Sequence, residues 1–495
     1  MSKTSHPTTT RRKFVQTSIF GAAGASTFCA LPANSNAAGA NGDIRVAVIG
    51  VGGRGSGHVG GLLGQKGVRV TALCDADYKH NENNANRVAK KQGQKPKVYE
   101  DYRKLVEDKE VDAVMIATPN HLHSLVSIAA AQNGKHVYVE KPVSHNIWEG
   151  RKLVEASEKY GKHGVVIQHG MQRRSDVGWR EVVEWIKDEP LGKMLVSRGF
   201  CYKPRKSIGN VDGPQQPPTE VDYNLWSGPR EVLPIMRQRF HYDWHWQRPY
   251  GNGDIGNQGP HQMDVARWMI GQEKCPPNVL SIGGRFGYDD DANTANTQIA
   301  FFDYDPVPLI FEVRGLPEKG LDWGKGMSHY KGARVGNVIE FEGGHITESK
   351  AYDKDGKTVK KFGVTNGRGH LENWLAAIRE GLKDGKHELE LSAHTGHISA
   401  ALCHMANISY YIGKEATAGQ CSGALGGNKM KEEVYDRFAS HLDKNGVDIT
   451  KNKPTLGPLL SFDPDKELFT GDGAEKANKL VKGDYRKEFS IPDKV

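Results

Sequence analysis

The sequence contains no apolar run long enough to span a lipid bilayer and no basic segment with interleaved aromatic residues. These absences argue against a membrane-embedded protein and against a nucleic-acid partner. The six cysteines are scattered without Cys-x-x-Cys spacing, so neither a disulfide framework nor a cysteine zinc site is expected. The formal charge of +8 is modest for 495 residues, because residues 1–40 supply four cations and no acidic residue.

Residues 1–40 contain the three parts of an export signal in order. Arg11 and Arg12 form a pair that resembles a twin-arginine motif, a weakly apolar segment runs from Ile19 to Leu31, and Ala38-Gly39-Ala40 resembles a cleavage site. The sequence therefore predicts a twin-arginine signal peptide and a mature protein, without a membrane anchor, in the periplasm or outside the cell. Because this route exports folded proteins, a cofactor bound before export is expected to travel with the chain.

The stretch from Ile44 to Gly55 predicts a dinucleotide-binding turn. A short apolar run ends in Gly50, Gly52 and Gly55, which have G-x-G-x-x-G spacing, and a helical pattern follows. Gly50 permits a tight turn, Gly52 allows a pyrophosphate to approach the backbone, and Gly55 allows the helix to pack closely on its strand. A second apolar run ends at Asp75, twenty positions after Gly55. A carboxylate there accepts hydrogen bonds from the adenosine ribose and favours NAD over NADP.

The pattern of apolar residues predicts an α/β protein with two domains and an extension. In residues 41–170, apolar strands at 44–49, 68–74, 111–117, 135–139 and 164–168 alternate with helical stretches, which predicts a doubly wound parallel Rossmann sheet. In residues 171–415, strands are expected at 194–202, 279–287, 295–303, 308–314 and 337–342, and they predict an open, mostly antiparallel sheet. Helices at 177–187, 263–270, 370–382 and 392–412 complete that domain. Residues 416–495 are polar, and we expect an extension that wraps the body or contacts a neighbour.

Three further stretches fall where the carboxyl edge of the Rossmann sheet should lie. One strand ends in Thr118-Pro119-Asn120 followed by His121 and His123, and another ends in Glu140-Lys141-Pro142. The third stretch carries Asn257 and His261 just before an apolar helix. Ligands of doubly wound sheets bind beyond the carboxyl ends of the strands, so these side chains are candidates for the chemistry.

Together, GVGGRG, ATPNHLH and EKP resemble the glucose–fructose oxidoreductase, inositol dehydrogenase and MocA family (Gfo/Idh/MocA), over roughly residues 44–412. The resemblance implies a Rossmann domain followed by an α/β domain whose sheet supports homo-oligomers. It implies that the pyrophosphate of NAD is bound by Gly50, Gly52, Gly53, Arg54 and Gly55. It implies a ribose contact for Asp75 and nicotinamide-side contacts for Thr118, Pro119, Asn120, His123, Glu140 and Lys141. It also implies that Lys141 is the catalytic lysine and His261 its acid/base partner.

Substrate contacts are expected from Asn257, Arg173 and Tyr202. Many family members have an aspartate at the position of Asn257, and an amide cannot accept a proton there. The segment from Arg239 to Tyr250 is rich in aromatic and hydrogen-bonding side chains, including His241 and Trp244, which suits a sugar ring. The irregular spacing of the histidines in this region predicts no metal site.

The sequence thus predicts an exported, NAD-dependent oxidoreductase that acts on a sugar, a polyol or a glycoside. Two alternatives remain open. The first is a redox-neutral NAD-dependent glycosidase, which oxidises a ring hydroxyl, eliminates the glycosidic bond and then reverses the oxidation. The second is a non-catalytic carbohydrate-binding protein with a vestigial cofactor site.

Overall fold

The computed structural model describes residues 42–317, 326–367, 369–384, 389 and 391–495. The predicted signal peptide lies outside these residues. All of the described residues belong to one compact unit. No helix in the described ranges is long and apolar enough to cross a membrane.

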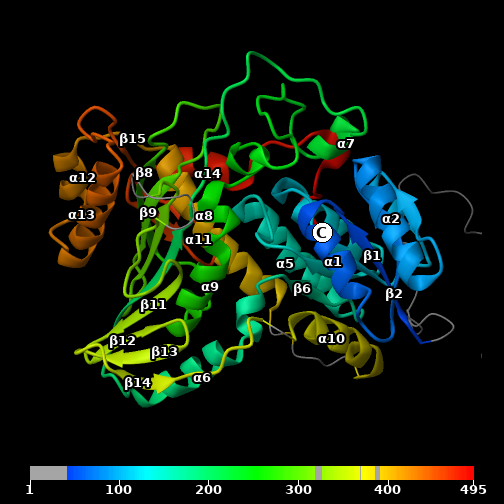
Figure 1. Ribbon diagram of the computed structural model, residues 1–495, viewed down its shortest axis with the longest axis horizontal. Helices are drawn as coiled ribbons and strands as arrows, with labels where there is room; N and C mark the ends of the chain where they lie inside the picture. Colours follow the sequence, from blue (N-terminus) through cyan, green and yellow to red (C-terminus); the bar gives the residue numbers. More distant parts are fainter. Residues whose placement is uncertain (1–41, 318–325, 368, 385–388, 390) are drawn as a thin grey trace, which may run out of the picture. The chain divides into compact units, whose positions relative to one another are not determined.

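The N-terminal half contains a six-stranded sheet in which every pair is parallel, with the order β3-β2-β1-β4-β5-β6. Its strands are β1 Ile44–Ile49, β2 Val68–Cys74, β3 Lys97–Tyr99, β4 Ala113–Ile116, β5 His136–Val139 and β6 Ile167–His169. The connecting helices are α1 Gly53–Leu62, α2 Tyr78–Gln92, α3 Tyr102–Val106, α4 His123–Gln132 and α5 Ile147–Gly161 (Figure 1). This order is that of a Rossmann fold, so the predicted doubly wound sheet is confirmed.

The second sheet has twelve strands and is antiparallel except for the pair of β7 Met194–Tyr202 with β10 Leu309–Arg314. Its other long strands are β8 Asn278–Gly284, β9 Thr297–Phe302 and β11 Val335–Phe341. Two hairpins extend one end through β12 Gly344–Thr347, β13 Lys350–Asp353 and β14 Thr358–Lys361. The predicted open, mostly antiparallel sheet is confirmed.

The strands at the centre of this sheet alternate between two apolar faces, as a period of two requires. Phe302 and Phe311 face a core formed with α9 Gly259–Met269 and α11 Ala393–Tyr411. Phe301 and Ile310 face the other way, against α13 Lys429–Lys444. Helix α6 Val177–Trp185 packs near the β11–β13 end.

The C-terminal extension wraps this second sheet. Helix α13 presents Val434, Phe438 and Leu442, spaced four residues apart, to the outer face, and α12 Ala418–Ala424 adds Cys421. The strands β15 Lys414–Glu415, β16 Thr455–Leu456, β17 Leu460–Asp463 and β18 Leu468–Thr470 join the edge beyond β8, and α14 Ala474–Lys482 follows. The extension therefore has firm apolar anchors, and it occupies the outer face over β8–β10.

The helix α10 His370–Asp384 belongs to the Rossmann core and does not close the second domain, so that prediction was wrong. Trp374 and Ile378 pack with Val48 and Leu62. Helical periodicity gives α10 an apolar face but does not say which partner covers it.

The irregular segment of residues 203–252, here called the strap, crosses from the second domain to the Rossmann domain (Figure 1). Tyr78 N donates to Glu220 O at 3.0 Å, and Asp222 N donates to Ala76 O at 2.9 Å. The short helix α7 Tyr223–Ser227 follows. The strap has its own apolar cluster, which includes Trp226, Phe240, Trp244 and Tyr250.

The C-terminal tail holds the strap in turn. Arg486 donates hydrogen bonds to the backbone oxygens of Asn224 and Gly228, at the end of α7, and its guanidinium stacks on the Phe489 ring. The red segment beside α7 in Figure 1 is this tail.

Candidate active site

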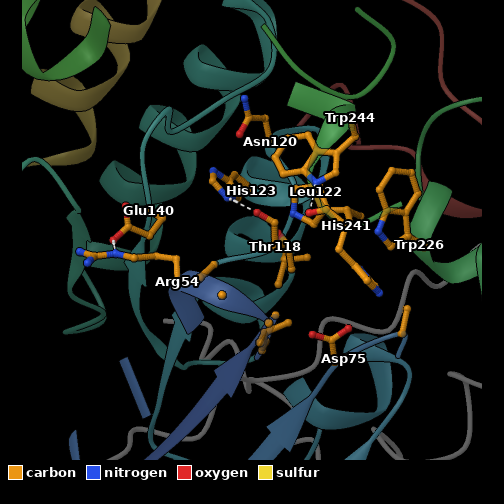
Figure 2. Close-up of a pocket in the computed structure, with 18 of the residues that line it drawn as sticks. Arg54, Asp75, Thr118, Asn120, Leu122, His123, Glu140, Trp226, His241 and Trp244 are labelled. Carbon is orange, nitrogen blue, oxygen red and sulfur yellow. Dashed lines mark hydrogen bonds and ion pairs between the residues drawn. The ribbon is translucent and has the colours of Figure 1, made fainter. Parts of the chain in front are cut away.

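A cavity of about 550 Å³ lies at the carboxyl ends of β1, β2, β4 and β5. The glycine turn and Asp75 form its Rossmann side, and Trp226, His241 and Trp244 of the strap form the opposite side. Figure 2 shows Asp75 and Glu140 on opposite sides of this cavity, with Thr118 and His123 near its centre. The strap therefore covers the edge where a doubly wound sheet binds its ligand.

The glycine turn requires glycine at two positions. Gly50 has a φ of +80°, and a β-carbon there would lie 2.6 Å from Thr118 N. A β-carbon on Gly55 would lie 1.7 Å from Gly50 O, so this residue permits the close packing of α1. Gly52 and Gly53 line the cavity at the start of α1, whose N–H groups favour a phosphate.

Asp75 lies at the end of β2 and lines the cavity. One carboxylate oxygen accepts from Val51 N at 2.7 Å, and the other accepts from Asp77 N at 3.0 Å. These bonds fix the carboxylate beside the glycine turn, where it is placed for the hydroxyls of a ribose.

Glu140 is buried and holds three groups together. It accepts from Arg54 Nε at 2.8 Å, contacts His58 Nε2 at 2.8 Å, and accepts from Lys141 N at 3.2 Å (Figure 2). Burial acts to raise the pKa of the Glu140 carboxyl, but the hydrogen bond with His58 and the charges of Arg54 and Lys141 outweigh it and hold the pKa well below its usual value. Glu140 is therefore an anion that orients Arg54 and the Lys141 backbone.

The predicted nicotinamide side is built by hydrogen bonds around β4. His123 uses both ring nitrogens, one to Pro142 O at 2.6 Å and the other to Thr118 O at 2.7 Å. Asn120 donates to Asn252 Oδ1 at 3.1 Å, and Pro119 lines the cavity beside it. Thr118 Oγ1 is buried without a hydrogen-bond partner in the described structure. A buried hydroxyl left in this state fits a polar ligand group beside it.

Lys141, Asn257 and His261 meet in the cavity, as predicted. The Lys141 ammonium donates to the backbone oxygen of Asn257 and to its side-chain oxygen, the latter at 3.2 Å. Burial lowers the pKa of Lys141, and the charges of Lys203, Arg54 and Arg205 add to this while Glu140 opposes it.

His261 lies near the start of α9. Burial, followed by the charge of Lys141, lowers the pKa of this imidazole well below its usual value, so His261 is neutral at pH 7. Its Nδ1 is buried without a hydrogen-bond partner among the described residues. Asp254, also nearby in the sequence, is unavailable because it is buried in an ion pair with Arg205 at 2.9 Å.

The strap brings aromatic and imidazole groups to the cavity. Trp244 stacks on His245 with ring centroids 3.8 Å apart, and burial lowers the pKa of His245 to about 3. His241 Nε2 lies 3.0 Å from Asp77 Oδ2, and its ring centroid lies 4.6 Å from that of His80. The ligand atoms of Asp77, His80 and His241 lie within 4.8 Å of one another, close enough for a metal ion. The prediction of no metal site remains a prediction.

Two expected substrate contacts lie elsewhere. Tyr202 is fully buried and donates to Glu312 Oε2 at 2.7 Å, in a network with Arg437, so it does not reach the cavity. Arg173 lines an adjoining cavity. Sequence reasoning also missed His58, His80, Gln172 and Trp226, because no motif marks these residues and only the fold brings them to the site.

The five cysteines in the described residues are buried and free.

The cavity as a whole fits a dinucleotide. It offers a turn that excludes β-carbons, a helix N-terminus, a carboxylate at the end of β2 and an unpaired Thr118 hydroxyl.

Comparison with known proteins supports this interpretation. The sequence model of an oxidoreductase family, NAD-binding Rossmann fold, matches residues 44–169, and the model of the same family's C-terminal alpha/beta domain matches residues 186–320. Inositol 2-dehydrogenase from Salmonella typhimurium is 31% identical over 160 residues, which is 32% of this chain and 46% of that protein.

Glycosyl hydrolase family 109 protein 1 from Akkermansia muciniphila is 30% identical over 144 residues, which is 28% of this chain and 30% of that protein. The chain thus spans less than half the length of both curated relatives. The WlbA dehydrogenase from Bordetella pertussis, solved in complex with NADH and UDP-GlcNAcA, shares the fold with a TM-score of 0.53. It is 16% identical, and the match covers 74% of this chain and 96% of that one.

Proposed function

The chain belongs to the Gfo/Idh/MocA family of NAD-binding oxidoreductases, and on that premise we propose that it transfers hydride between a nicotinamide and a hydroxyl-bearing carbon of a sugar, polyol or glycoside. The observation that carries the proposal is the meeting of Lys141 and His261 in the cavity that holds the glycine turn. The inositol 2-dehydrogenases support the substrate class.

The glycine turn and Asp75 would hold NAD, which when bound supplies the acceptor for the hydride of the alcohol carbon. Lys141 would take the hydroxyl proton, because burial and the neighbouring cations lower its pKa and favour its neutral amine. Both oxygens of Asn257 accept from the ammonium and fix its direction. Since the Asn257 amide cannot accept a proton and the lowered pKa of His261 makes its neutral imidazole a weak base, the proton would stay on Lys141, whose ammonium donates to both Asn257 oxygens.

The strap supports the proposal that the cofactor is retained between turnovers. It covers the cavity and is joined to the β2–α2 connection by two backbone hydrogen bonds, while the tail holds α7 in place. Opening the cavity would break these contacts together. Retention also suits the proposed export to the periplasm or beyond, which rests on residues 1–40 and is tested by cell fractionation.

The first experiment is the quantification of dinucleotide released by denaturing the purified, extensively dialysed protein. Near-stoichiometric NAD(H) is expected, and an empty protein would contradict retention. The second is formation of reduced nicotinamide after mixing the protein with sugars, polyols and glycosides. Lys141→Met should abolish it, whereas the exposed control Lys90→Met should not. Activity retained in Lys141→Met would refute the proposed role.

The redox-neutral glycosidase remains a second candidate, and the likeness to glycosyl hydrolase family 109 proteins favours it. A retained cofactor suits a cycle in which the ring hydroxyl is oxidised and later reduced on the same protein. Release of a phenol from an aryl glycoside without net reduced nicotinamide would support this candidate. Accumulation of an oxidised but intact glycoside would exclude it. A carbohydrate-binding protein, the third candidate, would neither release a phenol nor accumulate an oxidised glycoside.

A further inference from the structure

A second cavity, of about 440 Å³, adjoins the active site. Gln172 and His261 line both cavities, so the second cavity lies directly beside the proposed catalytic residue His261. Its walls come from the start of α6 and α9, the turn between β12 and β13, and the segment 363–367.

The walls of this cavity carry hydrogen-bonding groups that the protein does not fully use. Arg173 Nη1 and Glu348 Oε2 form an ion pair at 3.6 Å, a separation too long for a hydrogen bond, and their side chains are 29% and 47% exposed. Gln258 donates to Gln262 Oε1 at 3.2 Å, which leaves its own carbonyl oxygen as an acceptor. A ligand with several hydroxyls could bridge these donors and acceptors.

Two residues of the cavity have a strained backbone. Glu348 has a φ of +49° and Asn366 a φ of +53°, two of the five non-glycine residues with positive φ in the described chain. Glycine adopts such conformations readily, asparagine less readily, and glutamate only with strain. Such strain often marks binding sites, and here it presents a carboxylate and an amide to the same cavity.

We propose that this cavity binds the second sugar ring of a glycoside, on the far side of the glycosidic oxygen from the ring whose hydroxyl Lys141 deprotonates. The inference rests on the proposed function and narrows its substrate class from any polyol to glycosides of at least two rings. A cation, a carboxylate and two amides around one cavity match the hydroxyls of a sugar, and Trp179 supplies an apolar wall. The glycosidic bond would then lie near His261 and Gln172, which the two cavities share.

The test compares each disaccharide with the methyl glycoside of its reacting ring, using the holoenzyme and cellobiose, maltose and lactose as probes. The wild type should show a lower KM for at least one disaccharide than for the matching methyl glycoside. Arg173→Met and Glu348→Gln should each raise that KM by about 10-fold or more and change the KM for the methyl glycoside much less. Asn366→Gly, which relieves the backbone strain, should raise the KM for the disaccharide without lowering the stability of the protein. The exposed ion pair of Glu184, in the last turn of α6, and Lys187, just after that helix, supplies matched controls, Lys187→Met and Glu184→Gln, which should change neither KM.

Equal KM values for the two substrate types, or equal changes in both for the Arg173 and Glu348 variants, would overturn the second subsite. Binding of the same probes by calorimetry separates this failure from failure of the proposed function. A disaccharide that binds, loses affinity in Arg173→Met and yields no oxidised product keeps the subsite and refutes the oxidoreductase. A protein that oxidises methyl glycosides but binds no disaccharide of the panel more tightly keeps the oxidoreductase and refutes the subsite.

Discussion

Replacing Gly55 by alanine should displace helix α1 and thereby weaken the nucleotide site. The added β-carbon would lie 1.7 Å from Gly50 O, half of the 3.4 Å at which ordinary contact begins. Helix α1 must therefore move away from β1, and its N-terminal N–H groups move with it. Overpacking of this size costs about 3 kcal/mol, because the obstacle is backbone and cannot rotate away. The neighbouring Gly57 has no atom within 4 Å of its would-be β-carbon. Gly57→Ala should instead stabilise α1 by about 0.5–1 kcal/mol.

The assay is thermal unfolding of both variants together with the dinucleotide content after dialysis. Gly55→Ala should lower the unfolding midpoint by about 5 °C or more and lose its NAD, whereas Gly57→Ala should keep NAD and unfold at or above the wild-type temperature. Wild-type stability and NAD content in Gly55→Ala would refute the packing argument. Loss of NAD in both variants would show that α1 tolerates no substitution, and the contact with Gly50 would then not be the cause.

Three further predictions concern charge. Lys203→Met removes a cation that lowers the pKa of Lys141, so the alkaline rise of kcat/KM for alcohol oxidation should move to higher pH; an unchanged profile would show that Lys141 is not the titrating base. Asn257→Asp places a carboxylate beside the ammonium and should move the same rise further in the same direction; a shift to lower pH would contradict the assigned contact. Burial acts to raise the pKa of Glu467, but its bonds to His397 and Arg151 outweigh this and lower it. The stability that Glu467 contributes is thus present above its unfolded pKa and lost as the pH falls through its folded pKa. Glu467→Gln should destabilise the protein by about 3 kcal/mol at pH 7 and by less at pH 4; an equal loss at both would refute an ionic role.

Continuous apolar runs predicted most of the Rossmann sheet, because a buried parallel strand leaves a clear signal. The bounds of β1 and β2 match the prediction, whereas β3 was missed because it has only three residues and two of them are exposed. The glycine turn, Asp75 and Lys141 follow strand ends, where their residue types and spacing can be recognised, and His261 was proposed from the family resemblance; all of them line the cavity.

What the sequence could not show depends on tertiary contacts. Helix α10 was assigned to the wrong domain, because the apolar face of a helix does not identify its partner. The strap has no periodicity, so its position over the cavity came only from the structure. Tyr202 lies on a predicted strand, but its side chain forms hydrogen bonds with Glu312 and Arg437, away from the cavity, and the sequence did not reveal these partners.

Helix α10 and the tail are synthesised late, but they complete contacts of residues near the start of the chain. A nascent chain that ends before residue 370 lacks the helix that covers Val48 and Leu62, so the core of the nucleotide domain is incomplete until α10 has been synthesised. Arg486, which holds the end of α7, is made later still. The order of synthesis therefore leaves an interval in which the nucleotide domain has its full core while the strap still lacks its contacts with Arg486.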